Sequence, residues 1–401
     1  MSDISIARYF PYKGVKVTRQ SVSEDGKMSW VVLEPDERFT PTCWVCGEKA
    51  SRIHQYTHRR IRDLCLCEAE VHLNVQYRKI ECKKCDSIRV EHHDFVEPYA
   101  RVTHRLGRYV YELCKHMSIR AVAKHVGLDW KTVKEIDKHF LEKEYGQTQW
   151  EGLRLLAIDE ISIRRGHSYM TVVLNYLTGS VVWMSEGRSA ETLDEFFREM
   201  PEHIREQIEA VAIDMWDPYI KAVHKWCPSA KIIFDLFHVV RAFGRVIDIV
   251  RIEETKKACK DDKDIFKGSK YLLLKNKENL KGRQRLRLRK LLSMNKTLSS
   301  MYILKDYLKK LWQYKNRTSA QKFLLMWCRL AYETPAPALH KFAKMLIRYR
   351  DGILDHCLYP INTSVLEGCN NKIKSIARRA FGFHDNRYFA LKVIQAFSVN
   401  N

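Results

Sequence analysis

Three acidic residues occupy positions where their side chains could hold metal ions. Asp159 interrupts an otherwise apolar strand, Asp214 ends a later strand, and Glu367 lies on a late helix beside two asparagines. A buried carboxylate without a partner would be costly in the first of these positions. Two Mg²⁺ ions about 4 Å apart need several carboxylate oxygens that converge from different elements. We therefore expect these acids to hold two catalytic Mg²⁺ (or Mn²⁺) ions.

Each acid taken alone has an ordinary alternative, because strand-borne acids often form salt bridges or turns. Together, however, the three acids occur in the order Asp, Asp, Glu on two strands and a late helix, and this arrangement favours a metal site. Asp235 also ends a strand and competes with Asp214 for the second position. We prefer Asp214, because its strand is expected to lie beside the strand of Asp159. Lys374 and Arg378 follow Glu367 at helical spacing and could hold phosphate.

Two CxxC pairs, Cys43–Cys46 and Cys82–Cys85, have the spacing of zinc ligands. Zn²⁺ takes four tetrahedral thiolate or imidazole ligands, and each pair supplies two of them. We expect a structural zinc ion held by a small sheet with two knuckles. A redox pair is the alternative, and Cys65 and Cys67 form a CxC that could compete for the metal.

A change to helical periodicity over residues 103–141 indicates a helix-turn-helix. Ser118 precedes one short helix, Gly127 marks the turn, and Asp129 precedes a second helix. The expected core contains Val122, Val126, Leu128, Val133 and Ile136. The outer face of the second helix would offer Trp130, Lys131, Lys134 and Lys138 to a DNA major groove.

The charge balance favours a polyanionic partner. The 401 residues include 70 Lys and Arg against 48 Asp and Glu, which gives a formal net charge of +22. DNA is the simplest partner for such a protein. No apolar run approaches the roughly 20 residues of a membrane-spanning helix, and the first residues lack a signal-peptide core. We expect a soluble, intracellular protein that does not interact with membranes.

The order of elements after residue 150 predicts an α/β core. Strands are expected at Leu153–Ile163, Tyr169–Asn175 and Val181–Met184, followed by a helix, a strand at Ala210–Ile213, a helix and a strand at Lys231–Phe234. This is the element order of the ribonuclease H-like fold.

Residues 241–352 show only helical periodicity, with a strongly cationic run. A solvated surface and a DNA backbone contact are equally good interpretations of that run, which contains Lys281, Arg283, Arg285, Arg287 and Arg289.

Several blocks of this sequence resemble bacterial insertion-sequence transposases of the ISL-three family. They are the two CxxC knuckles, the helix-turn-helix, AIDEISIRRGHSYMTVV around Asp159, AIDMWDPYIKAV around Asp214, PSAKIIFDLFHVVR and EGCNNKIKSIARRAFGF. The resemblance runs from about Cys43 to Phe389 and implies a DDE triad of Asp159, Asp214 and Glu367. It also implies that His238, in a motif similar to (C/D)xxH, contacts DNA near the cleavage site. A helix-start histidine that faces the core is the alternative.

The resemblance implies a DNA transposase that binds terminal inverted repeats and carries out metal-dependent cleavage and strand transfer into target DNA. A homodimer or larger assembly is expected from the need to pair two ends. The resemblance also implies a cytoplasmic, nucleoid-associated bacterial protein. The expected architecture is an α/β ribonuclease H-like core with an all-helical insertion, preceded by a small zinc-binding β domain and a helix-turn-helix domain. The corresponding ranges are 1–100 (zinc-binding), 101–150 (helix-turn-helix and linker), 151–240 (core, first part), 241–355 (basic helical insertion) and 356–401 (core, with the Glu367 helix).

Two other functions remain open at this point. A zinc and helix-turn-helix regulator would bind DNA without cleaving it, and its function would survive the loss of Asp159. A structure-selective nuclease on the same fold would cut branched DNA without joining ends. The intact acids argue against the regulator, and the N-terminal modules and helical insertion argue against the nuclease.

Overall fold

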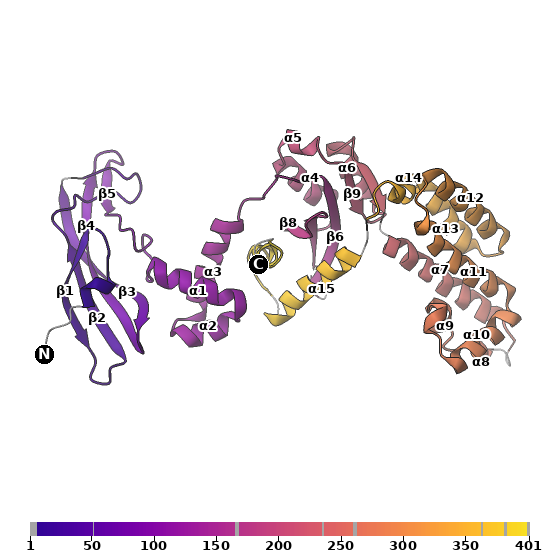
Figure 1. Ribbon diagram of the computed structural model, residues 1–401, viewed down its shortest axis with the longest axis horizontal. Helices are drawn as coiled ribbons and strands as arrows, with labels where there is room; N and C mark the ends of the chain where they lie inside the picture. Colours follow the sequence, from indigo (N-terminus) through magenta and orange to yellow (C-terminus); the bar gives the residue numbers. More distant parts are fainter. Residues whose placement is uncertain are drawn as a thin grey trace. The chain divides into compact units, whose positions relative to one another are not determined.

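The chain divides into two units between Glu144 and Tyr145. The computed structural model describes residues 6–50, 52–164, 168–234, 236–259, 263–361, 364–380 and 383–398. Figure 1 labels most of the helices and strands of both units. None of the helices in these ranges is both long and apolar enough to cross a membrane.

A five-stranded sheet forms most of the first unit. After a short 3-10 helix at Ile6–Tyr9, its strands follow in the order β1-β2-β4-β3, with β5 paired to β4. The parallel pair is β2 with β4, and the other neighbours are antiparallel. The strands are β1 (Val15–Val22), β2 (Met28–Pro35), β3 (Ile53–Leu66), β4 (Ala69–Cys82) and β5 (Ser87–Val90).

Three helices complete the first unit: α1 (His104–His116), α2 (Ile119–Val126) and α3 (Trp130–Tyr145). The Ser118 hydroxyl accepts a hydrogen bond from the Ala121 amide (3.3 Å), and Gly127 ends α2 in the left-handed conformation at φ 69°. These are the expected start and stop signals of a helix-turn-helix. The predicted core is confirmed, with three residues fully buried and two partly buried: Val122, Val126, Val133, Leu128 and Ile136.

A buried carboxylate joins the helices of this unit to its sheet. Asp63 on β3 accepts hydrogen bonds from the Tyr12 hydroxyl (2.7 Å), the Thr103 hydroxyl (2.7 Å) and Arg105 Nε (2.7 Å). Burial alone would raise the pKa of Asp63, but these donors, Arg105 foremost, lower it below its usual value. The charged carboxylate therefore fixes the start of α1 against β3, because Thr103 is also the N-cap of α1.

The second unit contains a mixed sheet with the order β10-β9-β6-β7-β8. The first three strands in the sequence are antiparallel, and β9 lies parallel to both β6 and β10. The predicted strand after the first helix therefore lies beside the first strand, as expected. The strands are β6 (Leu155–Arg164), β7 (Ser168–Asn175), β8 (Ser180–Glu186), β9 (Ala210–Ile213) and β10 (Lys231–Phe234).

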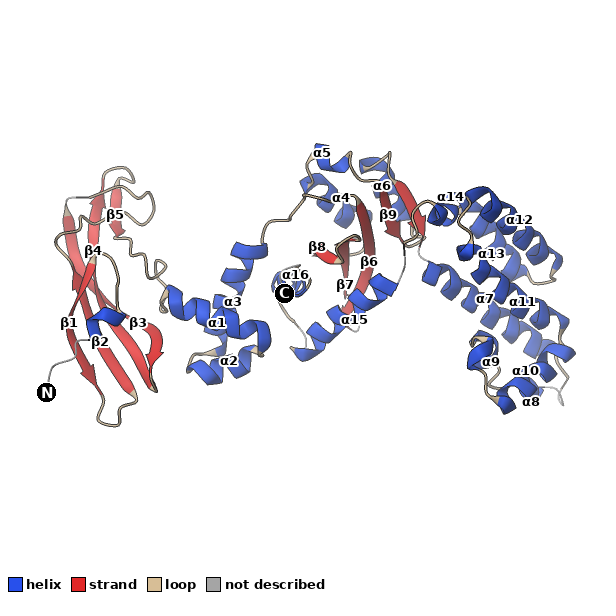
Figure 2. Ribbon diagram, viewed as in Figure 1, coloured by secondary structure: helices blue, strands red, loops and turns tan. Residues whose placement is uncertain are grey.

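Helices cover both faces of this sheet (Figure 2). Alternate residues of β6 enter two different apolar clusters. Leu156 and Ile158 pack with α4 (Ala190–Glu199) and α6 (Asp217–Trp226), close to the short α5 (Glu202–Arg205). Ala157 and Ile161 pack with α15 (Ser364–Arg379) and α16 (Asn386–Ala396). A side chain at an odd-numbered position of β6 therefore faces α15, because successive strand residues point to opposite faces.

A helical region lies between β10 and α15 in the sequence, and its described residues contain no strand. Its first helix begins at Leu236, five positions before the predicted insertion start at 241 (241 − 236). Its apolar side chains share one cluster with those beneath α4 and α6. The helices are α7 (Leu236–Lys257), α8 (Lys263–Phe266), α9 (Lys270–Leu274), α10 (Gly282–Met294), α11 (Lys296–Lys310), α12 (Arg317–Glu333), α13 (Pro337–Arg348) and α14 (Arg350–Leu354).

Gly352 lets α14 approach β10 closely, which predicts a specific sensitivity to substitution. A Cβ atom at this position would lie 2.5 Å from Phe234 Cε2 and 3.0 Å from the Ile232 carbonyl oxygen. We expect Gly352→Ala to lower the free energy of unfolding by about 1–3 kcal/mol, because the added methyl group would push α14 and β10 apart. Scanning calorimetry would measure the change.

Gly368→Ala is the matched control, since Gly368 lies within α15 and, among the described residues and apart from its own helix backbone, nothing lies within 4 Å of the added Cβ. This substitution should be neutral or stabilise the protein by up to about 1 kcal/mol, because alanine is the better helix former. Equal effects of the two substitutions would contradict the close packing of α14 on β10.

Candidate functional site

Strand register brings Asp159 and Asp214 together. Leu155 pairs with Ala210 and Ala157 with Ala212, so each residue of β9 lies 55 positions after its partner on β6 (210 − 155). The same interval separates Asp159 from Asp214, which follows the last residue of β9. Ala157 and Ala212 also share the apolar cluster on the α15 side of the sheet. Both carboxylates therefore lie on the same face of the sheet, Asp159 within β6 and Asp214 just past the end of the parallel strand β9.

His238 completes a group of potential metal ligands. One ligand atom from each of Asp159, Asp214 and His238 lies within 4.8 Å of the other two. His238 Nδ1 is 2.5 Å from Asp214 Oδ1, and its side chain is 21% exposed against 37% for Asp214. This contact arises because α7 begins directly after β10 and carries His238 in its first turn. The sequence predicted a DNA contact for His238 and gave no sign of its contact with Asp214.

Asn370 holds the other carboxylate. Its side-chain Nδ2 donates to Asp159 Oδ2 (2.6 Å), while the Glu160 amide donates to Asp159 Oδ1 (2.7 Å). Burial raises the pKa of Asp159, the hydrogen bond from Asn370 lowers it, and the nearby charge of Asp214 raises it; the net shift is upward. Two close acids of this kind are stabilised in their ionised form by a cation between them.

Glu367 does not belong to this group of ligand atoms in the described part of the chain. It is exposed on α15, three positions before Asn370 (370 − 367). Lys374 and Arg378 are also exposed on α15. The structure thus brings together two of the three predicted acids and adds His238 and Asn370. The alternative second acid, Asp235, lies outside the described residues.

Glu160 turns to the opposite face of the sheet. Burial raises its pKa, and Arg188 partly offsets this effect. Its neighbour Tyr219 is fully buried on α6, and the Tyr219 hydroxyl lies 2.7 Å from the Thr171 hydroxyl. Because successive side chains of a strand point to opposite faces, Asp159 and Glu160 lie on opposite sides of the sheet, and only Asp159 of these two belongs to the ligand group.

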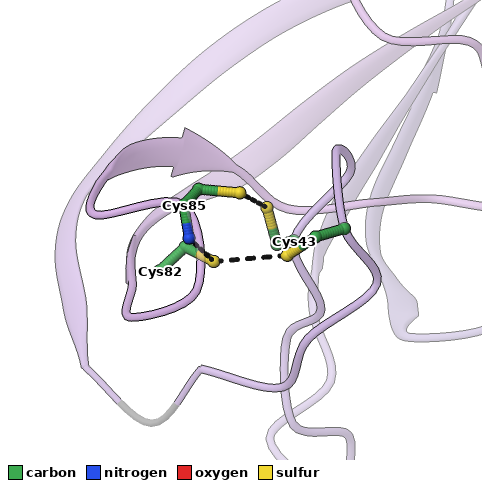
Figure 3. Close-up of side chains that lie close together, drawn as sticks. Cys43, Cys82 and Cys85 are labelled. Carbon is green, nitrogen blue, oxygen red and sulfur yellow. Dashed lines mark hydrogen bonds between the residues drawn. The ribbon is translucent and has the colours of Figure 1, made fainter.

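Four cysteines of the first unit form a second ligand group (Figure 3). The sulfur atoms of Cys43, Cys46, Cys82 and Cys85 all lie within 4.8 Å of one another, and the thiols are free of disulfides. Cys46 and Cys82 sulfurs are 3.4 Å apart, and those of Cys43 and Cys85 are 3.9 Å apart. The Cys85 amide donates to the Cys82 sulfur (3.4 Å) and lowers the pKa of Cys82 to about 7. Four converging thiols are the donor set of a structural zinc site.

The competing CxC is outside this group. Cys65 and Cys67 are exposed near the β3–β4 turn, and Cys67 adopts a left-handed conformation with φ 54°. The knuckle turn itself uses Gly47, whose φ is 71°. The predicted choice of the two CxxC pairs as zinc ligands is therefore supported by the geometry.

Two cationic surfaces occupy separate helices. On α3, Trp130 is 47% exposed and Lys131 is exposed, while Lys134 and Lys138 are half-buried. A shallow hollow beside Trp130 is lined by Arg120, Lys124 and Gly127 among others. On α10, Leu288 and Leu291 are buried and the basic side chains face solvent: Arg283, Arg285, Arg287 and Arg289, with Lys281 just before the helix.

Comparisons with known proteins match all parts of this architecture. A family model described as a transposase (ISL3 type) covers residues 156–393. A second, the helix-turn-helix domain of transposase family ISL3, covers residues 91–141. A third, the zinc-finger of transposase IS204/IS1001/IS1096/IS1165, covers residues 40–85.

Two similar proteins extend over most of the chain. The transposase for insertion sequence element IS1001 of Bordetella parapertussis is 38% identical over 97% of this chain and 97% of its own length. The transposase for insertion sequence element IS1557 of Mycobacterium tuberculosis is 28% identical over 90% of this chain and 86% of its own length.

The cysteine geometry predicts which thiols retain zinc. Purified protein should contain a single tightly held zinc ion, measured by inductively coupled plasma mass spectrometry. Cys82→Ser should lose it and lower the melting temperature of the first unit, because the remaining three thiols leave an open coordination position.

Cys65→Ser is the control, since Cys65 is exposed and outside the ligand group. It should keep its zinc and its melting temperature. Zinc loss in both variants, or in neither, would contradict the assignment.

Proposed function

The chain belongs to the ISL3 family of transposases, and we propose that it mobilises an insertion sequence by a metal-dependent DDE mechanism on DNA. Its relatives are named as transposases of insertion sequence elements and match it nearly end to end. The observation that supports the mechanism is the closeness of the carboxylates of Asp159, on β6, and Asp214, which follows the neighbouring strand β9.

The mixed sheet of the second unit is proposed to be a ribonuclease H-like core. Three antiparallel strands followed by two parallel ones, in the order β10-β9-β6-β7-β8, support this assignment. The proposed domains keep the ranges expected from the sequence: 1–100, 101–150, 151–240, 241–355 and 356–401. The helical region between β10 and α15 is then an insertion into the core.

Asp159, Asp214 and Glu367 are proposed to hold two Mg²⁺ (or Mn²⁺) ions. The residues present fit hard divalent cations, because the two closest acids offer carboxylate oxygens and repel each other without a cation. When bound, such ions activate the attacking oxygen and stabilise the leaving one. Glu367 is proposed as the third acid because Asn370, one turn further along α15, already bonds Asp159.

His238 and Asn370 are proposed to position the carboxylates. The Asn370 side chain donates a hydrogen bond to one carboxylate oxygen of Asp159, and the Glu160 backbone amide donates to the other. His238 donates from Nδ1 to Asp214 and, from the start of α7, could also contact the DNA strand. Groups held in this way lose little freedom when substrate binds, which favours reaction.

The reaction consists of two balanced exchanges at phosphorus. In the first, a water oxygen bonds to the scissile phosphorus, the P–O3′ bond breaks, and the departing 3′-oxygen takes up a proton. In the second, that 3′-hydroxyl attacks a phosphodiester of target DNA and releases another 3′-hydroxyl. One phosphodiester bond forms for each one broken in this second step, so strand transfer needs no external energy source.

DNA recognition is assigned to the basic surfaces. The α3 residues Trp130, Lys131, Lys134 and Lys138 are proposed to contact the terminal inverted repeats. The exposed arginines of α10, together with Lys374 and Arg378 on α15, would bind phosphates of the ends or of the target. A homodimer or larger assembly is proposed because two ends must be joined to one target.

Loss of the paired carboxylates should abolish catalysis without loss of DNA binding. Asp159→Asn and Asp214→Asn should each lower end cleavage and strand transfer on the order of 1,000-fold or more, because charge stabilisation at the reacting phosphate is lost. Labelled DNA carrying the element's ends, with Mg²⁺ or Mn²⁺, would report the joined products. Glu367→Gln should lose activity to a similar extent.

Asp217→Asn is the matched control. Asp217 lies three positions after Asp214 but bonds Arg348 (2.9 Å) and Tyr349 (2.8 Å), outside the ligand group. Its variant should cleave at close to the normal rate. Cleavage by Asp214→Asn at the normal rate would contradict the DDE assignment of this residue.

A further inference from the structure

Two large, exposed aromatic residues follow the strands that lead to Asp214 and His238. Trp216 is 45% exposed and Phe237 is 50% exposed. Ile213 and Phe234 are paired, and they are the last residues of β9 and β10. Trp216 and Phe237 each follow three positions after these paired residues. The two aromatic residues thus occupy equivalent positions after the carboxyl ends of two neighbouring parallel strands.

Both residues lie next to members of the ligand group. The Trp216 amide donates to the Asp214 carbonyl oxygen (2.7 Å), so a tight turn links the two residues. The Phe237 ring lies 5.6 Å from the His238 ring, centroid to centroid, at an angle of 87°. His238 in turn contacts Asp214 at 2.5 Å. The aromatic residues therefore lie at the rim of the group that would bind the scissile phosphate.

Local folding does not account for a tryptophan at position 216. Trp216 is the N-cap of α6, where Ser, Thr, Asp or Asn is favoured, and its side chain makes no cap hydrogen bond. The helix instead obtains its core contacts from Tyr219, Ala222 and Val223, which are buried. On α7 the buried residues nearest its start are Val239 and Phe243, and Phe237 is exposed.

We infer that Trp216 and Phe237 form a stacking surface for the nucleobases next to the scissile phosphate. Flat aromatic side chains bind the faces of bases with little dependence on sequence. Paired, stacked bases do not offer those faces, so the nucleotide beside the cleaved bond must leave the duplex stack. This inference rests on the proposed function, because it requires DNA at the carboxylates.

A cycle of protein and DNA changes tests the stacking contact. Cleavage would be measured on a duplex carrying the element's end and on the same duplex lacking the base next to the cleaved bond. Trp216→Ala and Phe237→Ala should each lower kcat/KM on the intact duplex roughly 10- to 100-fold, the size of a lost base–aromatic stack. At least one of these defects should shrink severalfold on the abasic duplex, because the contact is already missing there.

Conservative and remote variants separate stacking from folding. Trp216→Phe should retain most of the activity, because it keeps an aromatic face. Tyr332→Ala removes a similarly exposed aromatic residue (49%) on α12 and should leave cleavage unchanged.

The outcomes distinguish this inference from the proposed function. Full activity of both alanine variants on the intact duplex would overturn stacking and leave the transposase assignment standing. Equal defects on intact and abasic DNA for both variants would also overturn stacking and indicate a structural role or a protein-binding role. A wild-type protein that cleaves neither duplex would contradict the proposed function and, with it, this inference.

Discussion

The candidate site of the second unit depends on two like charges that the apolar packing of the sheet holds at close range. Asp159 lies on the central strand and Asp214 directly follows the neighbouring one, and the parallel pairing of these strands places both carboxylates on the α15 face. Apolar clusters on both faces fix that register, since a shift by one residue would exchange the faces of Asp159 and Ile158. The fold thus holds two carboxylates whose charges repel each other, and a bound cation would remove that repulsion.

Distant parts of the chain meet at this pair. His238 reaches Asp214 from the first helix after β10, and Asn370 reaches Asp159 from a helix that begins at Ser364. The helical region between them returns to the sheet through α14, whose Gly352 lies against Phe234. This return contact lets a long, basic, helical segment stand between two parts of the site without separating them.

Much of this arrangement could be predicted from the sequence. Apolar alternation gave the strands of the second unit, and the spacing of the CxxC pairs gave the four zinc ligands, because both signals are local. The contacts of His238 and Asn370 could not be predicted, since they depend on which face of a helix meets a strand far away in the sequence. The exposure of Glu367 has the same cause: its helix was predicted, but its rotation about the helix axis was not.

The central claim is that Asp159 and Asp214 jointly hold a divalent cation when DNA is bound. Anomalous X-ray scattering from crystals of the protein with an end duplex and Mn²⁺ tests it most directly. The account predicts a manganese peak bridging oxygens of these two carboxylates, with Glu367 turned toward the metal. A peak coordinated by Asp214 and Asp235 without Asp159, or no peak at this edge of the sheet, would contradict it.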